Sequence, residues 1–455
     1  MNKILLLILL CLIQYNANAQ KKLNLNLEDA TEYALNNSTL IVNAKLKVLD
    51  AKKQKIETRA IGLPKLNLGA GYNYFLDIPT QLMPDFMGPA VYGILLKEEL
   101  IRQPPQQTSR GVFPVKFGQK HNLTLKADLN TIIFSGEYIV ALKTSKVFED
   151  FTAKQLESTI SDIKNKTRQA YIPALLIKEN INILDKNIAN LSKLKTEMDE
   201  MYKEGFVEKL DADRIDLSLQ NLIIEKDNLS RQLQIVKNAL KMTIGMNIND
   251  TLLLDDNIEN ILSKIDNSIF LNKFDYAQRA DYNMLKTSLE LQKLNIKRYQ
   301  SQYLPSLIGF GSYSQKMTGN NSDDVKWYPT SLVGLQLNVK LFDGFGRKAK
   351  VQRAKIALEM AQNNLKNMEN VISMQIDNAK KSYFSALERV KAREDNLALA
   401  QRIYDTTKIK YKEGVGSSVE LTQAEQSLYQ AQSNLLKAKY DLLDAEIKLL
   451  SALGK

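Results

Sequence analysis

The chain has 455 residues, with 62 Lys and Arg against 51 Asp and Glu and a formal net charge of +11. Gly (19) and Pro (10) are scarce, which argues against a linker-rich chain, and one His and one Cys exclude a Cys/His zinc site or a disulfide framework. The same scarcity disfavours a Ser-His or Cys-His catalytic pair, so we expect no enzyme, no catalytic residue, no cofactor and no bound metal. The basic residues are spread through long helical segments, which favours solvated helix faces over a nucleic-acid site.

The N-terminus has the features of an export signal. Met1–Lys3 is a short positive segment, Ile4–Ile13 is an apolar core too short to span a bilayer, and Ala17–Ala19 has the small-x-small pattern of a cleavage site. These features predict a secretory signal peptide over residues 1–19. Leucines rather than small residues precede Cys11, so we do not expect a lipoprotein. No later segment of about 20 apolar residues follows, so the sequence predicts no transmembrane helix.

The remainder of the chain is internally duplicated. Four short motifs appear twice in the same order, and each copy carries a helix, two strands, a long helix, a turn and a second helix. The duplication predicts a first repeat over residues 20–246, an irregular polar linker over 247–276 and a second repeat over 277–455. The paired motifs are Leu63–Leu66 with Leu304–Leu307, Phe134–Gly136 with Phe342–Gly344, Tyr202–Gly205 with Tyr411–Gly414, and Thr243–Gly245 with Ala452–Gly454.

Two strands are predicted in each repeat, because apolar and polar residues alternate with a period of two. Each run has about ten residues, which is the span of a tilted membrane strand. Trp327 and Tyr328 stand at the edge of the fourth strand, where the aromatic girdle of a membrane barrel would lie. On the strands alone, the face of a soluble sandwich is an equal alternative. The predicted strands cover residues 64–76, 121–133, 305–315 and 328–341.

Four strands cannot close a barrel around a pore, and a bilayer does not tolerate open sheet edges. If these strands span a membrane, several chains must therefore share one barrel, and three chains would supply twelve strands. The Pro-rich segment 77–120 would then form a long loop outside the cell, where it could plug the mouth, contact surface partners or be a variable surface loop. Ile308 and Phe310 fall on the face expected to be polar, and His121, at the start of a strand, is not expected to be a ligand.

Long helices follow the second strand of each repeat. Residues 347–411 contain no Pro or Gly, and their apolar residues follow a heptad spacing with one stutter. The counterpart in the first repeat, residues 138–203, contains Pro173, at which we expect a kink. Gly205 and Gly414 are expected to end these helices and to turn the chain. The returning helices are predicted over residues 210–243 and 418–453.

The sequence resembles the TolC-type outer membrane efflux family in the order of its features. These features are the export signal, the duplication, the Leu-Pro strand starts at Leu63 and Leu304, the Phe342–Gly344 motif and the Tyr411–Gly414 turn. The opening segment Leu27–Asn37 fits as well, and the resemblance covers essentially the whole mature chain. It implies an α+β membrane protein in which three chains form a twelve-stranded β-barrel across the outer membrane. This barrel would be continuous with a twelve-helix periplasmic α-barrel, with the linker between the repeats at its equator.

The resemblance also implies the partners and the location of the protein. A homotrimer in the outer membrane of a Gram-negative bacterium would contact outer membrane lipid and extend into the periplasm. There its hairpin tips would meet a periplasmic adaptor (membrane fusion) protein and, through it, an inner-membrane transporter. Efflux and type I protein secretion use the same conduit, and the sequence does not separate them. A soluble periplasmic coiled-coil scaffold is the alternative, against which the apolar faces of the strands argue.

Candidate site residues follow from the resemblance. Members of the family have acidic residues beyond the second turn that form a periplasmic constriction, and these positions correspond to Glu420 and to Gln423, which departs from the pattern. Asp211 is the repeat equivalent of Glu420, so a ring of carboxylates from three chains is expected, with cation binding and mutually raised pKa values. The alternative is that they are acidic residues favoured by a helix N-terminus. The expected adaptor-contact tips are Gly205, Phe206, Val207, Gly414, Val415 and Gly416, and the expected barrel-lumen residues are Lys65, Lys126, Asp128 and Lys340.

Overall fold

A computed structural model of the chain describes residues 22–103, 111–264, 274–321 and 323–455. The predicted signal peptide over residues 1–19 therefore lies outside the described residues, as does part of the predicted linker. The chain divides into two compact units, which we call the helical unit and the strand unit and describe separately. The helical unit comprises Met1–Gln54, Ser145–Lys293 and Lys355–Lys455, and the strand unit comprises Lys55–Thr144 and Leu294–Ala354.

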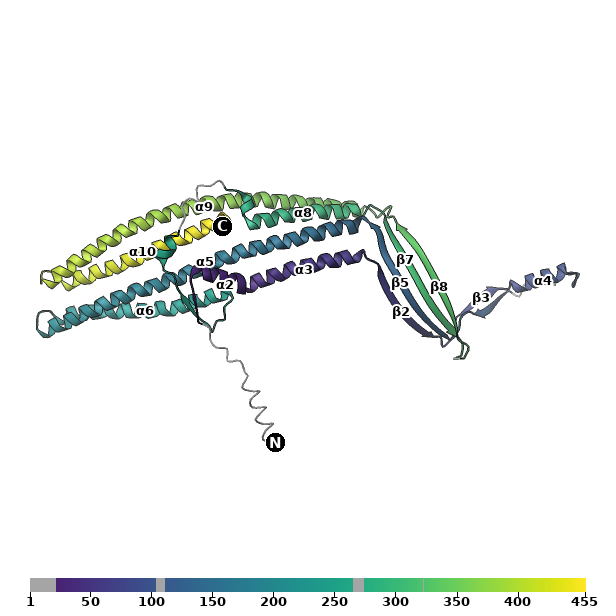
Figure 1. The fold of residues 1–455 in the computed structure, drawn as a ribbon, viewed down its shortest axis with the longest axis horizontal. Coiled ribbons are helices and arrows are strands. Elements are labelled where there is room, and N and C mark those ends of the chain that lie inside the picture. Colours follow the sequence, from purple (N-terminus) through teal and green to yellow (C-terminus); the bar gives the residue numbers. More distant parts are fainter. Residues whose placement is uncertain (1–21, 104–110, 265–273, 322) are drawn as a thin grey trace, which may run out of the picture. The chain divides into compact units, whose positions relative to one another are not determined.

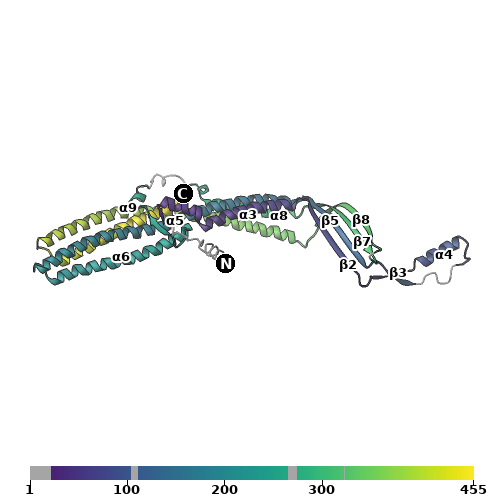
Figure 2. The ribbon, with the colours of Figure 1, turned by 60° about the horizontal axis from the view of Figure 1, so that its bottom comes forward.

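Two helical hairpins dominate the helical unit. In each hairpin a long helix turns back into a shorter one, and the two members lie side by side in both views (Figure 1, Figure 2). The longer helix of the first hairpin is continuous through Pro173. The first hairpin consists of α5 (Gly136–Lys203) and α6 (Lys209–Ile244), and the second of α9 (Gly346–Lys412) and α10 (Ser418–Ala452).

Shorter helices precede the strands of each repeat. In the first repeat the helical segment is divided at Ser38, whose ψ of 125° is extended. Its first helix is capped by Asn26, whose side chain accepts a hydrogen bond from the backbone N–H of Asp29 at 2.8 Å and so satisfies a free helix donor. These helices are α2 (Leu27–Asn37), α3 (Thr39–Ile61) and α8 (Ala280–Ser301), the last preceded by a 3₁₀ turn, η2 (Tyr276–Gln278).

The segment between the repeats is more ordered than predicted. Residues 247–276 were expected to be irregular, yet they contain a strand and a short helix, and the strand pairs in parallel with the first strand of the chain. This strand forms because Leu252 and Leu254 alternate into the core, where they are buried. The elements are β1 (Lys22–Leu25), β6 (Thr251–Leu254) and α7 (Ile258–Leu262).

Hydrogen bonds join this small sheet to the middle of α5. The buried hydroxyl of Tyr171 donates to the carbonyl of Leu25 at 3.0 Å and contacts Asp256 Oδ2 at 3.2 Å. Asp256 Oδ2 also accepts the backbone N–H of Leu27 at 2.6 Å. One buried tyrosine therefore connects the beginning of the described chain with the segment between the repeats.

The strand unit contains a four-stranded antiparallel sheet in the order β2-β5-β7-β8 (Figure 1). Three of the strands form where the sequence alternates, and β7 forms although Ile308 and Phe310 interrupt its alternation. A bulge interrupts the pairing of β5 with β7 between Ile132 and Phe134. Within the described residues, the two outer strands, β2 and β8, each pair with one neighbour and so form the two edges of the sheet. The strands are β2 (Lys65–Tyr74), β5 (His121–Ser135), β7 (Ser306–Gly319) and β8 (Lys326–Asn338).

The long segment 77–120 has secondary structure of its own. Two short strands form an antiparallel pair, and a helix of mainly apolar residues comes between them in the sequence. Pro104 and Pro105, also in this segment, lie outside the described residues. Across the described part of the chain, no helix combines the length and apolar character that crossing a membrane requires. The elements are β3 (Thr80–Pro84), α4 (Met87–Lys97) and β4 (Val112–Lys116).

Candidate functional site

The register of the four-stranded sheet gathers its charged residues on one face, which we call the charged face. Side chains alternate along a strand, and the pairing of β2 with β5 therefore places Lys65, Lys126 and Asp128 on the same side. Lys126 Nζ lies 3.0 Å from Asp128 Oδ1. Lys340, predicted to accompany them, lies beyond the end of β8 at Asn338, so the pairing of the strands does not place it.

The opposite face, which we call the apolar face, carries no Asp, Glu, Lys or Arg in any of the four strands, all of whose residues are described. Leu68 and Val333 on this face are 81% and 89% exposed. His121 also lies here, where its Nδ1 is 2.7 Å from the hydroxyl of Tyr72. A broad exposed apolar surface is unfavourable in water and marks a surface that meets lipid or another protein.

Phe310, which interrupts the predicted alternation, is accommodated by a glycine on the neighbouring strand. It lies on the charged face opposite Gly334. A Cβ atom at Gly334 would stand 2.7 Å from Phe310 Cζ, closer than van der Waals contact allows. The ring therefore takes the space that a side chain at position 334 would need. This large–small pair explains why an aromatic residue is tolerated on a polar face.

A buried arginine fixes the junction between β8 and α9. Arg347 Nε donates to Asp343 Oδ2 at 2.9 Å, and the same oxygen accepts the backbone N–H of Arg347 at 3.0 Å. Two further guanidinium nitrogens donate to the carbonyls of Gln302 and Leu341 at 3.2 and 3.4 Å. The ring of Tyr303 lies 4.6 Å from the guanidinium carbon. Asp343 of the Phe342–Gly344 motif thus caps the beginning of the long helix.

The hairpin turns present the residues predicted as tips. Gly205 and Gly414 have φ angles of +78° and +74°, a conformation that side chains rarely adopt, so these glycines allow the turns. Phe206 and Val415 follow them and are 76% and 77% exposed. Each hairpin therefore displays one large apolar side chain at its end, in equivalent places of the two repeats.

The other two predicted tip residues are less accessible. Val207 packs partly against the hydrophobic core shared by the four hairpin helices. A Cβ atom at Gly416 would lie 3.0 Å from the backbone nitrogen of Tyr411, so the chain passes close to itself there. Phe206 and Val415 are consequently the tip residues that a partner protein could reach most readily.

A polar cluster joins the two hairpins just behind their turns. Ser418 is a buried residue, 3% exposed, and its hydroxyl donates a short hydrogen bond to Asp211 Oδ1. Arg214 Nη1 donates to the same hydroxyl at 3.2 Å and lies 3.6 Å from Asp211 Oδ1. Asp211 belongs to α6 and Ser418 to α10, so the cluster connects the two repeats. The aspartate is therefore engaged within the chain.

Glu420 and Gln423, the other residues predicted at a constriction, are exposed on α10. The backbone N–H of Glu420 donates to Ser417 Oγ at 3.2 Å, the capping bond that begins this helix. Asp211 and Glu420 are each the third residue of their helix, as the duplication requires. Among the described residues no hydrogen bond joins the side chains of Asp211 and Glu420, and the ring of carboxylates from three chains stays a prediction.

An acidic side chain of the second hairpin is partly buried farther from the turns. Glu425 on α10 has one carboxyl oxygen, Oε2, buried without a hydrogen-bond partner. Burial raises the pKa of Glu425 to about 7, although the positive charge of Lys408 on α9 opposes the shift. Burial and the neighbouring Glu425 raise the pKa of Tyr404 to about 12. The hairpin core therefore contains a carboxyl group that titrates near neutral pH.

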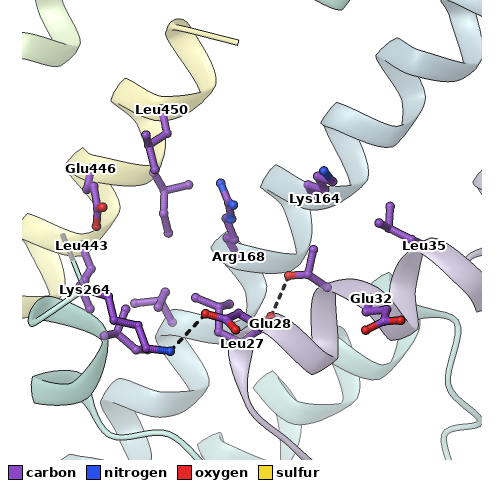
Figure 3. A pocket seen from close by; sticks show the side chains of 14 residues that line it. Leu27, Glu28, Glu32, Leu35, Lys164, Arg168, Lys264, Leu443, Glu446 and Leu450 are labelled. Atoms are coloured by element: carbon purple, nitrogen blue, oxygen red, sulfur yellow. Dashed lines mark hydrogen bonds and ion pairs between the residues drawn. The ribbon is translucent and has the colours of Figure 1, made fainter. Parts of the chain in front are cut away.

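A pocket of about 360 Å³ lies between α2, α5 and α10 (Figure 3). Leucines, isoleucines and six charged residues line it, and Figure 3 shows two of the charged residues, Arg168 and Glu446, on opposite helices. Burial raises the pKa of Glu446 to about 7, against the opposing effect of Arg168. Lys264 Nζ contacts Glu28 Oε1 at 3.1 Å at the border of the pocket. The arrangement is amphipathic, with a carboxyl that titrates near neutral pH.

Sequence reasoning missed the residues that connect distant parts of the chain. Arg347 follows Asp343 by four residues at the start of a helix, and that spacing was a usable signal for a side-chain pair. Arg214 likewise follows Asp211 by three residues on α6, but Ser418 gave no such signal, because its contacts with both residues join different repeats. A residue whose partner lies some two hundred positions away is found only from the fold.

The second repeat matches a known protein family. Residues 277–455 match the family described as outer membrane efflux protein. The chain is 26% identical over 152 residues to the outer membrane efflux protein BepC of Brucella suis biovar 1, and 26% identical over 153 residues to the alkaline protease secretion protein AprF of Pseudomonas aeruginosa. These matches cover 33% and 34% of this chain and 32% of the length of each relative.

The fold is also similar to solved structures along nearly its whole length. The outer membrane protein VceC of Vibrio cholerae superimposes with a TM-score of 0.69 at 15% identity, covering 94% of this chain and 96% of that one. Together with the family match, this likeness confirms the resemblance to TolC-type outer membrane efflux proteins.

Proposed function

We propose that this chain is the outer membrane channel component of a tripartite efflux or type I secretion system, because residues 277–455 match the outer membrane efflux protein family. Three copies form a conduit from the periplasm to the exterior. The protein catalyses no reaction, and the energy for transport comes from an inner-membrane transporter.

The observation that carries this proposal is the separation of charge across the four-stranded sheet. The apolar face has no Asp, Glu, Lys or Arg, whereas the charged face holds Lys65, Lys126 and Asp128. This is the pattern of a barrel wall with lipid outside and water inside. The sheet has two open edges, β2 and β8, which a bilayer would not tolerate. Pairing β8 of one copy with β2 of the next removes every edge, and three copies give twelve strands.

The hairpins supply the periplasmic part of the conduit. With 67 residues, α9 has a length of about 100 Å, and α5 with 68 residues is equally long. In a trimer the four hairpin helices of each chain give twelve helices around one axis. The hairpin turns lie at the end remote from the strands in sequence, which suits Phe206 and Val415 to contact a periplasmic adaptor.

The acidic residues behind the turns belong at the narrow entrance of this helical barrel. We infer that Glu420 from three chains lies around the axis, with Gln423 one turn farther along α10. Asp211 contributes by holding α6 against Ser418 of α10 within each chain. An entrance lined by carboxylates admits cations more readily than anions.

A soluble periplasmic scaffold is the competing function. It would leave Leu68, Val333 and their neighbours exposed to water, whereas a membrane barrel covers them with lipid. The two accounts differ in where the protein is found and in how many copies associate.

Fractionation followed by electron microscopy separates them. The full chain is expressed in a Gram-negative host, and the outer membrane fraction is extracted with detergent and imaged by negative stain. We expect hollow three-fold cylinders longer than about 100 Å, from the length of α9 alone. Recovery of the protein in the soluble periplasmic fraction as monomers or dimers would contradict the proposal.

A further inference from the structure

The charged face carries lysines at successive levels along the strands. Lys326 on β8 pairs with Thr318, Lys316 on β7 pairs with Thr124, and Lys126 on β5 pairs with Ser314. Residues two apart on one face are about 6.6–6.8 Å apart along a strand. Because Thr318, Lys316 and Ser314 follow one another at this spacing on β7, the three lysines occupy three consecutive rows. Lys65 adds a fourth positive charge nearer the helices.

The strands contain little negative charge to balance these lysines. Asp128 is the one acidic residue of the four strands, and its carboxylate pairs with Lys126 at 3.0 Å. Four lysines against one aspartate leave three positive charges per chain. Lys65, Lys316 and Lys326 are exposed, and within the described part of the chain no ion pair engages them.

The space around these lysines is open. Gly69, opposite Lys126, and Gly71, opposite Thr124, lie on the same face of the neighbouring strand β2. A Cβ atom at either glycine would meet nothing within 4 Å. Small residues beside long cationic side chains leave room for a solute to approach the ammonium groups. The carboxylates nearest in sequence to Lys326, Asp323 and Asp324, belong to the turn beyond the strands.

We propose that the barrel section of this conduit is anion-attracting, so that it concentrates negatively charged molecules over positively charged ones, whereas the carboxylates at the periplasmic entrance act in the opposite sense. The inference rests on the proposed function, in which three copies surround one axis. Each lysine then belongs to a ring of three, and the net charge of +3 on the strands of one chain becomes +9 for the whole barrel. A cavity walled by one sign of charge in a surround of low dielectric constant concentrates ions of the opposite sign. The solutes that the barrel section favours are therefore acidic: anionic drugs, anionic metabolites or acidic polypeptides.

The potential near the lysines can be measured by the rate at which a cysteine reacts with charged reagents. Ser314→Cys places a thiol on the charged face, opposite Lys126 and two residues from Lys316. The full chain is reconstituted in lipid vesicles and treated with a sulfonate-bearing or a trimethylammonium-bearing methanethiosulfonate reagent. The unsubstituted chain, in which Cys11 is the one cysteine, supplies the background, and a small free thiol supplies the reference ratio.

We expect Ser314→Cys to react about fivefold faster with the anionic reagent than with the cationic one, relative to the free thiol, at low ionic strength. Adding Lys126→Gln and Lys316→Gln should bring this ratio close to that of the free thiol, whereas adding Asp128→Asn should raise it. Salt should reduce the preference. A ratio at or below that of the free thiol would overturn the inference, as would a thiol that neither reagent reaches.

A second reporter distinguishes failure of the inference from failure of the proposed function. Gln315→Cys lies one residue away on the apolar face, where lipid should protect it from both reagents. If Gln315→Cys and Ser314→Cys react equally, both faces are in water and the membrane barrel itself is wrong. If Gln315→Cys is protected while Ser314→Cys prefers the cationic reagent, the barrel stands and the anion preference is wrong.

Discussion

The hydroxyl of Ser418 donates a hydrogen bond to the carboxylate of Asp211, and this contact joins the starts of the two returning helices α6 and α10. Arg214 contacts both residues, so the three side chains form one cluster behind the hairpin turns. The two halves of the duplicated chain are thereby connected at the end that we assign to the periplasmic entrance.

Replacement of Ser418 by Ala should loosen this end of the molecule. It removes the donor to Asp211 and leaves the carboxylate to Arg214 alone, at a cost of about 1 kcal/mol. Hydrogen exchange of the backbone amides around both turns should become faster. Ser427→Ala is the matched control, because Ser427 donates within α10 to the carbonyl of Gln423. Equal exchange in both variants would show that the cluster does not hold the hairpins together.

Tyr171 provides a test of the connection between the beginning of the chain and the linker. Tyr171→Phe keeps the ring but removes the hydroxyl that bonds Leu25 and Asp256. Because the carbonyl and the carboxylate lose this donor but each keeps a backbone N–H donor, we expect a loss of about 1 kcal/mol of unfolding free energy. Tyr202→Phe, on a tyrosine that is 45% exposed, should cost little by comparison. Chemical denaturation followed by circular dichroism measures both, and equal midpoints would contradict the role assigned to Tyr171.

The buried carboxyl of Glu425 makes stability depend on pH in a definite direction. Its pKa rises from an ordinary value of 4.5 to about 7 in the fold, mainly because of burial. Between these values the folded protein holds the proton more tightly than the unfolded chain, so unfolding free energy falls as pH increases through this window.

Glu425→Gln should abolish this part of the pH dependence. The variant should be more stable than the unsubstituted protein at pH 8, by up to about 3 kcal/mol, and nearly equal to it at pH 4. Glu388→Gln on the exposed surface of α9 serves as the control. Thermal unfolding at a series of pH values checks the expectation, and parallel curves for the two variants would refute it.

Two glycines of the sheet should respond differently to the same change. Gly334→Ala introduces a Cβ that would lie 2.7 Å from Phe310 Cζ, so the ring or the strand must shift. Gly69→Ala meets nothing within 4 Å and should be tolerated. We expect the thermal midpoint for loss of the oligomer on gel electrophoresis to fall for Gly334→Ala and to change little for Gly69→Ala. Equal midpoints would mean that the contact between Phe310 and Gly334 is not tight.

Local sequence patterns predicted the main helices and strands of this fold well. Contacts between residues distant in the sequence could not be predicted in this way. Alternation along residues such as Leu66 and Leu68 marks strands because a strand with one apolar face must alternate. Gly205 and Gly414 mark turns because few other residues adopt a positive φ.

The features that were missed depend on the meeting of distant segments. The pairing of β6 with β1 gives order to residues 251–254, but each strand has only four residues and is too short to show a period by itself. The contact of Ser418 with Asp211 likewise joins residues that the sequence alone does not bring together. For Phe310 the alternation fails because Gly334 makes room for the ring, a compensation that is visible only once the strands are in register.

The central claim is that neighbouring chains close one barrel through their edge strands, and disulfide cross-linking tests it most directly. Leu68→Cys on β2 is combined in turn with Ser331→Cys, Val333→Cys or Leu335→Cys on β8, all on the apolar face. Within one chain β5 and β7 separate these strands by about 14 Å, too far for a disulfide. We predict covalent trimers after oxidation of membranes for at least one combination, and none when the β8 cysteine is moved to Gln336 on the charged face. Monomers alone in all three combinations would contradict a barrel shared between chains.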